Sequence, residues 1–215
     1  SRVYHCYTAH GPLPLIGAME RSCNFFFFTL GDQAGIEGLK YWAHQFGYDE
    51  PTGLDLPGES VGRLDNRDPL SFAIGQGLFQ ASPLQVAVAI SIIAGGKRVT
   101  PHLRRGGGIP PRDTAISRES IDVLREALKE VVFGEHGTAK LAGLRAMHVA
   151  GKTGTAQAGK VNNVELPDHA WFASYAPYED PRYTVVVFVR NAGRHGGEAA
   201  APIAEQIYRR LMEKK

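Results

Sequence analysis

The stretch Val149-Ala150-Gly151-Lys152-Thr153-Gly154-Thr155-Ala156-Gln157 organises the rest of the sequence. It is short, interrupted by glycines and contains β-branched residues, which predicts a β-strand with one open face. Side chains alternate along a strand, so Lys152 and Gly154 are expected on one face and Thr153 and Thr155 on the other. A cation and hydroxyls beside a bare glycine suit a peptide-like substrate with a carboxylate. An edge strand with a solvated lysine is the alternative that these residues alone leave open.

The composition is that of an ordinary folded protein. Its 215 residues are 43% hydrophobic and 21% charged, which fits one large domain or two small ones. The formal net charge is only +2 and the basic residues are dispersed, so nucleic acid is not an expected partner. The aromatic run Phe25–Phe28 is far too short to span a bilayer, and no signal peptide is visible. Because the chain starts with serine, we expect that a preceding piece has been removed.

The two cysteines, Cys6 and Cys23, form neither a zinc-ribbon nor a CxxC pattern. His5, Cys6 and His10 are residue types that ligate metals, but no fourth ligand follows at a typical distance. Loop or core positions are therefore the favoured interpretation, and no metal or cofactor is expected. A disulfide between the two cysteines would require an oxidising compartment.

The hydrophobic pattern predicts mainly helices before the Lys152 strand. The four phenylalanines of residues 25–28 cover every face of their helix, so this helix is expected in the centre of the core. Ser22 and Asn24 precede it, and capping of this helix is one interpretation of both. The expected helices are residues 13–21, 25–30 with its end at Gly31, 35–46, 84–94, a helix capped by Ser117, 139–144 and 199–212.

Three strands are expected at the C-terminal end of the chain. Ala170–Ala176 and Tyr183–Val189 follow the Lys152 strand, and Asp180-Pro181-Arg182 connects them as a hairpin. A further short strand is expected at 99–103, a long loop at 48–70 and a polar connection at 160–168. Three consecutive strands with tight links predict an antiparallel sheet covered by helices, which is an α+β fold.

Two motifs occur in the order typical of penicillin-binding proteins and related β-lactamases: Ser22-Cys23-Asn24 matches S-x-N, and Lys152-Thr153-Gly154 matches K-T-G. Other stretches resemble the transpeptidase domain of class B penicillin-binding proteins, specifically the cell-elongation type called penicillin-binding protein 2. These stretches are Thr52-Gly53-Leu54-Asp55-Leu56-Pro57-Gly58-Glu59, Ala73-Ile74-Gly75-Gln76-Gly77, Ser82-Pro83-Leu84-Gln85 and Asp168-His169-Ala170-Trp171-Phe172-Ala173. The resemblance implies the fold shared by penicillin-binding protein transpeptidases and serine β-lactamases.

The sequence departs from the family pattern at one point. None of the nine serines has a lysine three residues later, so the S-x-x-K nucleophile motif is absent. In the resembled family this motif lies upstream of S-x-N, on a helix preceded by two strands of the same sheet. We therefore expect residues 1–215 to be the C-terminal part of a transpeptidase domain, truncated at its N-terminal side.

The resemblance implies a peptidoglycan D,D-transpeptidase whose serine nucleophile lies outside this chain. Ser22 is then expected to shuttle a proton between the motif lysine and the leaving nitrogen. The amide of Asn24 is expected to orient the substrate backbone, and Lys152 to supply positive potential to the substrate carboxylate. These three residues are the expected catalytic set, and they should converge on one cleft.

Substrate binding is expected from Thr153, Gly154, Thr155 and Gln157. The resemblance assigns the Thr155 hydroxyl to the carboxylate, although an ideal strand points it away from Lys152, so a twist or a bulge at Gly154 is expected. The N–H of Thr155 or a neighbour, with Gln157 as one candidate, is expected to complete an oxyanion hole. Trp171 and Phe172 are expected in the core.

The implied partners are peptidoglycan stem peptides, β-lactams and the membrane-bound cell-wall elongation machinery. The implied location is the inner membrane with the catalytic domain in the periplasm, the anchor lying outside this chain. A serine β-lactamase, a D,D-carboxypeptidase and a non-enzymatic β-lactam sensor domain stay open as alternatives with the same fold. An α+β binding module with chance motifs is the remaining one, and it predicts that Ser22 and Lys152 lie far apart.

Overall fold

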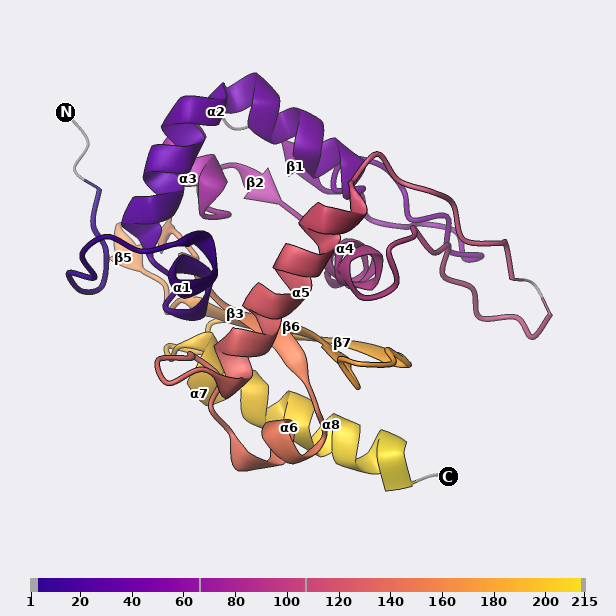
Figure 1. Cartoon of the computed structure of the whole chain (residues 1–215). Helices are drawn as coiled ribbons and strands as arrows, with labels where there is room; N and C mark the ends of the chain where they lie inside the picture. The colour runs from indigo at the N-terminus through magenta and orange to yellow at the C-terminus, as the bar shows by residue number, and fades with distance from the viewer. Residues whose placement is uncertain (1–3, 66, 107, 214–215) are drawn as a thin grey trace.

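The computed structural model describes residues 4–65, 67–106 and 108–213. Its centre is an antiparallel sheet in the order β3 (Ala150–Ala156), β6 (His169–Ala176) and β7 (Tyr183–Val189). Lys152 lies opposite Ala173, which in turn lies opposite Val186. Helices pack against both faces of the sheet, α8 (Ala201–Glu213) on one side and α4 (Pro83–Gly95) and α5 (Arg118–Phe133) on the other (Figure 1). The predicted α+β class and its antiparallel sheet are confirmed.

Alternate residues of the strands enter two separate cores. On the α8 side, Phe172, Val187 and Tyr208 belong to one buried cluster, and Ser174 hydrogen-bonds the Tyr208 hydroxyl at 3.0 Å. On the other side, Tyr175 joins a cluster with residues of α4 and α5, including Leu128. Because helices cover both faces of the sheet, a ligand can reach the strands only at the edges of the sheet.

Local sequence signals explain the start of both helices on the second face. Ser82 forms a capping box with Gln85 at the start of α4, and Ser117 accepts a hydrogen bond from the Ser120 N–H at the start of α5. The buried Gln85 also donates to the Tyr48 and Glu50 carbonyls at 2.9 and 3.1 Å. These hydrogen bonds hold the loop that follows α2 (Asn24–Gln45) against the core.

The second helix corrects two predictions. Helix α2 spans Asn24–Gln45 and continues through Gly31, and its backbone leaves the helical region at Gly35 instead (φ 67°). A Cβ at Gly31 would lie 2.7 Å from both Ala73 Cβ and Pro69 O, so glycine is required there for close packing against α3 (Pro69–Ala73). The phenylalanine run is not wholly buried either: Phe28 is 7% exposed, but Phe25 is 72% exposed because only one side of α2 is covered.

Several other expectations change in detail. Residues 99–103 form no strand; an isolated bridge joins Arg98 to Arg112 instead. The polar connection at 160–168 contains a small hairpin, and the last expected helix is divided at Ala200. The remaining elements are α1 (Leu15–Glu20), β1 (Arg63–Leu64), β2 (Phe79–Gln80), α6 (Ala142–Ala146), β4 (Lys160–Val161), β5 (Val164–Glu165) and α7 (Gly196–Ala199).

Candidate active site

A cleft of about 670 Å³ lies between the start of α2, the segment after α3, and β3. Six of the predicted site residues line it, namely Ser22, Asn24, Lys152, Thr153, Gly154 and Thr155. Gln157 lies one residue beyond the end of β3 and is exposed. The chain therefore brings the S-x-N and K-T-G motifs to one place, as the sequence predicts.

Ser22 occupies a backbone position that normally favours glycine. It follows the C-cap of α1 with φ 53°, in the left-handed region. The N–H groups of Ser22 and Cys23 donate back to the carbonyls of Met19 and Ala18, at 3.3 and 2.9 Å. This turn directs the Ser22 hydroxyl toward β3, and the strained conformation is a reason to assign the side chain a function.

Lys152 reaches across the cleft to Ser22. Its Nζ donates hydrogen bonds to Ser22 Oγ and, at 3.0 Å, to the Thr153 carbonyl. Burial lowers the pKa of the Lys152 ammonium group from 10.5 to about 8, because removal from water disfavours its charge. The group is thus a cation at neutral pH, but it gives up its proton more readily than a surface lysine.

Asn24 is the first residue of α2, and its side chain does not cap that helix. The N-cap position is Cys23, with no side-chain hydrogen bond to the helix. Instead, Asn24 Nδ2 donates to the His5 carbonyl at 3.2 Å. The capping interpretation of Ser22 and Asn24 therefore finds no support, and the Asn24 amide lies at the cleft, tied to the N-terminal segment.

The two threonines line the same cleft as Lys152 without a bulge. β3 pairs residue by residue with β6 from Ala150 to Ala156, so the expected bulge at Gly154 is wrong. The cleft runs along the free edge of β3, where side chains from both faces of an edge strand can be reached. Thr153 Oγ1 lies 2.6 Å from Thr138 Oγ1, and Thr155 Oγ1 lies 3.3 Å from His195 Nδ1.

Gly154 is enclosed on both sides. A Cβ on this residue would lie 3.2 Å from Trp171 Cβ. On the opposite side the backbone of Gly196 approaches, and a Cβ there would lie 2.6 Å from the Gly154 carbonyl oxygen. Both glycines therefore permit the close packing of α7 against β3. Trp171 is half-buried and Phe172 is fully buried, so the core assignment holds fully only for Phe172.

Sequence reasoning missed several residues of the cleft. His195, Thr138 and Gln76 all contact the β3 residues through their side chains. The Gly75-Gln76-Gly77 segment stood out as part of the resemblance, but nothing in it indicated a contact with β3. His195 and Thr138 gave no signal, because their contacts join segments 40 and 15 positions apart.

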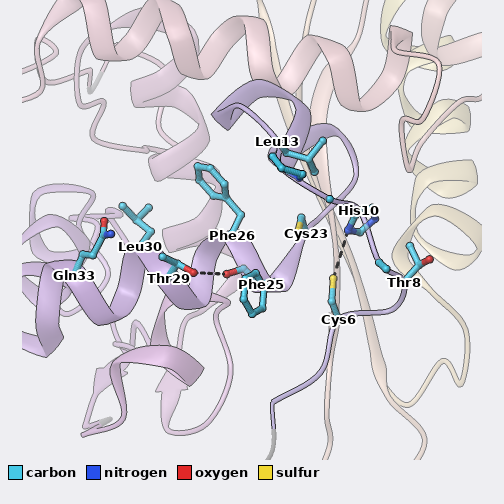
Figure 2. Close-up of a pocket in the computed structure, with 13 residues that line it drawn as sticks. Cys6, Thr8, His10, Leu13, Cys23, Phe25, Phe26, Thr29, Leu30 and Gln33 are labelled. Carbon is cyan, nitrogen blue, oxygen red and sulfur yellow. Dashed lines mark hydrogen bonds between the residues drawn. The ribbon is translucent and has the colours of Figure 1, made fainter.

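A second hollow adjoins the cleft and holds both cysteines. Its volume is about 750 Å³, and it lies between the N-terminal segment and α2 (Figure 2). Cys6 Sγ lies 3.6 Å from His10 Nδ1, and the possible ligand atoms of Cys6, His10 and Cys23 all lie within 4.8 Å of one another. Two thiols and an imidazole are a donor set that suits zinc. Cys23, which the sequence spacing did not join to this group, is the middle residue of S-x-N.

The arrangement of the cleft suits acyl transfer to or from a peptide. A hydroxyl in contact with an ammonium group can pass a proton. The cation and the threonine hydroxyls attract a carboxylate, and the free edge of a strand can pair with an extended peptide.

The chain belongs to the family of penicillin binding protein transpeptidase domains, whose model matches residues 3–209. It is similar to the peptidoglycan D,D-transpeptidase MrdA of Haemophilus influenzae, with 34% identity over 93% of this chain and 36% of that protein. It is also similar to the solved penicillin-binding protein PBP2 of Helicobacter pylori, with a TM-score of 0.87, 30% identity, and coverage of 98% of this chain and 42% of that one.

The same Helicobacter pylori protein has been solved in a complex with MreC, and this structure matches with a TM-score of 0.84, 32% identity, and coverage of 96% and 41%. The predicted family is confirmed, and the similar proteins include penicillin-binding protein 2, the type that the sequence predicts. The chain spans less than half the length of these relatives.

Proposed function

We propose that this chain is the C-terminal part of the catalytic domain of a peptidoglycan D,D-transpeptidase that cross-links the cell wall. In this proposal an S-x-x-K helix and two strands, in a preceding part of the complete protein, supply the nucleophile. The support is that this chain contains the S-x-N and K-T-G motifs in one cleft and matches less than half of each relative.

The proposed reaction has two acyl-transfer steps. The serine oxygen attacks the carbonyl carbon between two D-alanines, the C–N bond breaks, and the terminal D-alanine leaves with a proton on its nitrogen. An amine of a second stem peptide then attacks the serine ester, forms a new amide and releases the serine. A β-lactam enters the first step and stays on the serine, because its leaving group remains attached.

The residues of this chain serve both steps in the proposal. Ser22, held by Lys152, relays the proton to the leaving nitrogen. Lys152, Thr153 and Thr155 bind the carboxylate of the terminal D-alanine, while Asn24 orients the peptide backbone.

The oxyanion hole is assigned to an N–H on the free edge of β3. The N–H and C=O of one strand residue point to the same side, and the Thr155 carbonyl faces Gln76 on the free edge. The Thr155 N–H therefore also faces this edge. The Gln157 N–H, the second candidate, donates to Gln76 Oε1 at 3.3 Å, which favours Thr155.

The single observation that carries the proposal is the hydrogen bond between Lys152 and Ser22, residues 130 positions apart. A binding module with chance motifs gives no reason for this contact. Pocket residues from both motifs surround it, as one reaction centre requires.

The proposed partners follow from the relatives. Stem peptides are the substrate and β-lactams the inhibitors, and the MreC complex of the Helicobacter pylori relative supports a place in membrane-bound elongation machinery. Among the described residues, no helix is long and apolar enough to cross a membrane. We place the catalytic domain in the periplasm, held by an anchor in another part of the protein.

The test is made on the complete protein. A fluorescent penicillin should label it stoichiometrically, and a pentapeptide donor with an acceptor amine should give a cross-linked product and free D-alanine. Rapid hydrolysis of the penicillin would instead indicate a β-lactamase. D-alanine release without cross-linking would indicate a carboxypeptidase, and labelling without any turnover a sensor. No labelling at all would refute the proposal.

A further inference from the structure

Gln76 occupies the free edge of β3 with its side chain. Its Nε2 donates to the Thr155 carbonyl at 2.9 Å, and its Oε1 accepts from the Gln157 N–H at 3.3 Å. A carboxamide has the same donor and acceptor as a peptide unit. The side chain of Gln76 thus makes the pair of hydrogen bonds, to the C=O of one residue and the N–H two positions on, that one residue of a neighbouring parallel strand would make.

The backbone around Gln76 holds this side chain in place. Gly75 and Gly77 have φ of 69° and 76°, conformations in which glycine is favoured, so the chain turns on both sides of the glutamine. The Gln76 N–H donates to the Ser71 carbonyl at 2.9 Å and ties the turn to α3. The α3 helix in turn packs against Gly31 of α2, the helix that begins with Asn24.

Gln76 therefore links the two halves of the cleft. Through α3 it is joined to α2, and through its carboxamide to the end of β3. Backbone groups on the free edge of β3 are already hydrogen-bonded on both sides of the Thr155 N–H. Lys152 Nζ donates to the Thr153 carbonyl, and Gln76 binds the Thr155 carbonyl and the Gln157 N–H. The Thr155 N–H lies on the same edge between these contacts.

We propose that Gln76 is a positioning residue, whose carboxamide substitutes for a strand partner, holds the Thr155 carbonyl and thereby orients the Thr155 N–H at the edge of β3 for the reacting carbonyl. Because Gln76 occupies the backbone groups beyond the Thr155 N–H, a peptide substrate pairs with the free edge of β3 only up to Thr155. This inference rests on the proposed transpeptidase function. The role requires a donor and an acceptor on one planar group, which glutamine provides and glutamate provides only when protonated.

The first test uses the 215-residue chain itself and needs no nucleophile. In Gln76→Ala, the Gln157 amide loses its acceptor, so its hydrogen exchange should accelerate by roughly fivefold, the loss of one hydrogen bond. Gln80→Ala is the matched control, because Gln80 is exposed on β2. An unchanged exchange rate at Gln157 would refute the contact on which the inference depends.

The second test uses acylation of the complete protein by a fluorescent penicillin. Gln76→Ala should lower the second-order acylation rate constant by roughly 10- to 100-fold, the effect of a small misplacement at a reacting centre. Gln76→Glu should be equally slow at pH 8, where its carboxylate repels the Thr155 carbonyl. As the pH falls toward 5, protonation restores the donor, and the ratio of its rate to that of the parent should rise at least about threefold.

The outcomes separate this inference from the proposed function. A Gln76→Glu ratio that stays constant between pH 8 and 5 would overturn the positioning role, since a purely structural defect does not follow carboxyl protonation. Acylation of Gln76→Ala at the parental rate would overturn it as well. If the parent protein is not acylated at all, the proposed function fails, and the exchange rate at Gln157 then decides whether Gln76 closes the edge of β3.

Discussion

Lys152 Nζ donates a hydrogen bond to Ser22 Oγ, although the two residues belong to different halves of the chain. The contact joins the end of α1 to the edge strand of the sheet. Ser22 is strained at φ 53° and Lys152 is partly desolvated, so both residues carry a cost in stability. Two residues that each lower the stability of the fold, in contact with each other in a cleft, are typical of a functional site rather than of a structural one.

Loss of the Lys152 ammonium group should impair chemistry more than folding. In the complete protein, Lys152→Ala should lower the rate of acylation by a β-lactam by roughly 100-fold, because a preorganised cation at the carboxylate and at Ser22 is removed. The measurement is stopped-flow or gel-based labelling, with circular dichroism to show an intact fold. Parental acylation by the variant would remove Lys152 from the site.

The pH dependence of stability gives an independent test of the Lys152 environment. The folded pKa of about 8 lies below the ordinary 10.5, so the unfolded chain binds this proton more tightly. Lys152 therefore lowers stability fully below pH 8, and this cost disappears as the pH rises toward 10.5. Lys152→Met should raise the free energy of unfolding at pH 7 by about 1–3 kcal/mol.

Urea unfolding at several pH values measures this difference in the 215-residue chain. The gain of Lys152→Met over the parent should shrink between pH 8 and 10.5. Lys160→Met is the control, since the Lys160 side chain is 60% exposed and its removal should give no such trend. A gain that does not change with pH would show that Lys152 is not desolvated.

The backbone of Ser22 predicts opposite effects on stability and function. Glycine adopts φ near 53° without a Cβ penalty, so Ser22→Gly should be about 1 kcal/mol more stable than Ser22→Ala. Both variants lack the hydroxyl, and in the complete protein both should lose transpeptidation to a similar extent. Thermal unfolding compares the pair, and equal melting temperatures would argue against strain at this position.

The sequence predicts best those helices and strands whose positions depend on the conformational preferences of neighbouring residues. The bounds of β7, Tyr183–Val189, match the prediction because a run of β-branched residues favours a strand whatever surrounds it. The start of α4 was equally clear from Ser82 and Pro83. The convergence of Ser22 and Lys152 was predicted from motifs and chemistry, since no local pattern joins positions so far apart.

The errors arose where tertiary contacts override local preference. The sequence predicts a helix end at Gly31, but the missing Cβ of this residue admits α3, and α2 continues past it. Hydrophobicity alone predicts that Phe25 lies in the core, yet one side of α2 is uncovered and Phe25 is exposed. Gln76 contacts a residue 79 positions away, so its role could be found only from the folded chain.

The close approach of α7 to β3 predicts a strong effect of one methyl group. In Gly196→Ala, the new Cβ would lie 2.6 Å from the Gly154 carbonyl oxygen and still closer to that of Trp171. The expected loss of stability is about 1–3 kcal/mol, since backbone atoms cannot move aside easily. Gly95→Ala is the control, because a Cβ there meets nothing within 4 Å. Equal stability of both variants in urea would contradict the packing described.

The 215-residue chain, taken alone, should form no covalent penicilloyl adduct. An activated serine needs a base within hydrogen-bond reach, and no serine of this chain has a lysine one helical turn further on. Ser22 does contact Lys152, but their proposed task is proton relay for another nucleophile, not attack. Intact mass spectrometry after incubation with a labelled penicillin decides the matter, with the labelled complete protein as the positive control. A stoichiometric adduct that maps to Ser22 would show that Lys152, with its pKa lowered to about 8, acts as the base of a nucleophile within this chain.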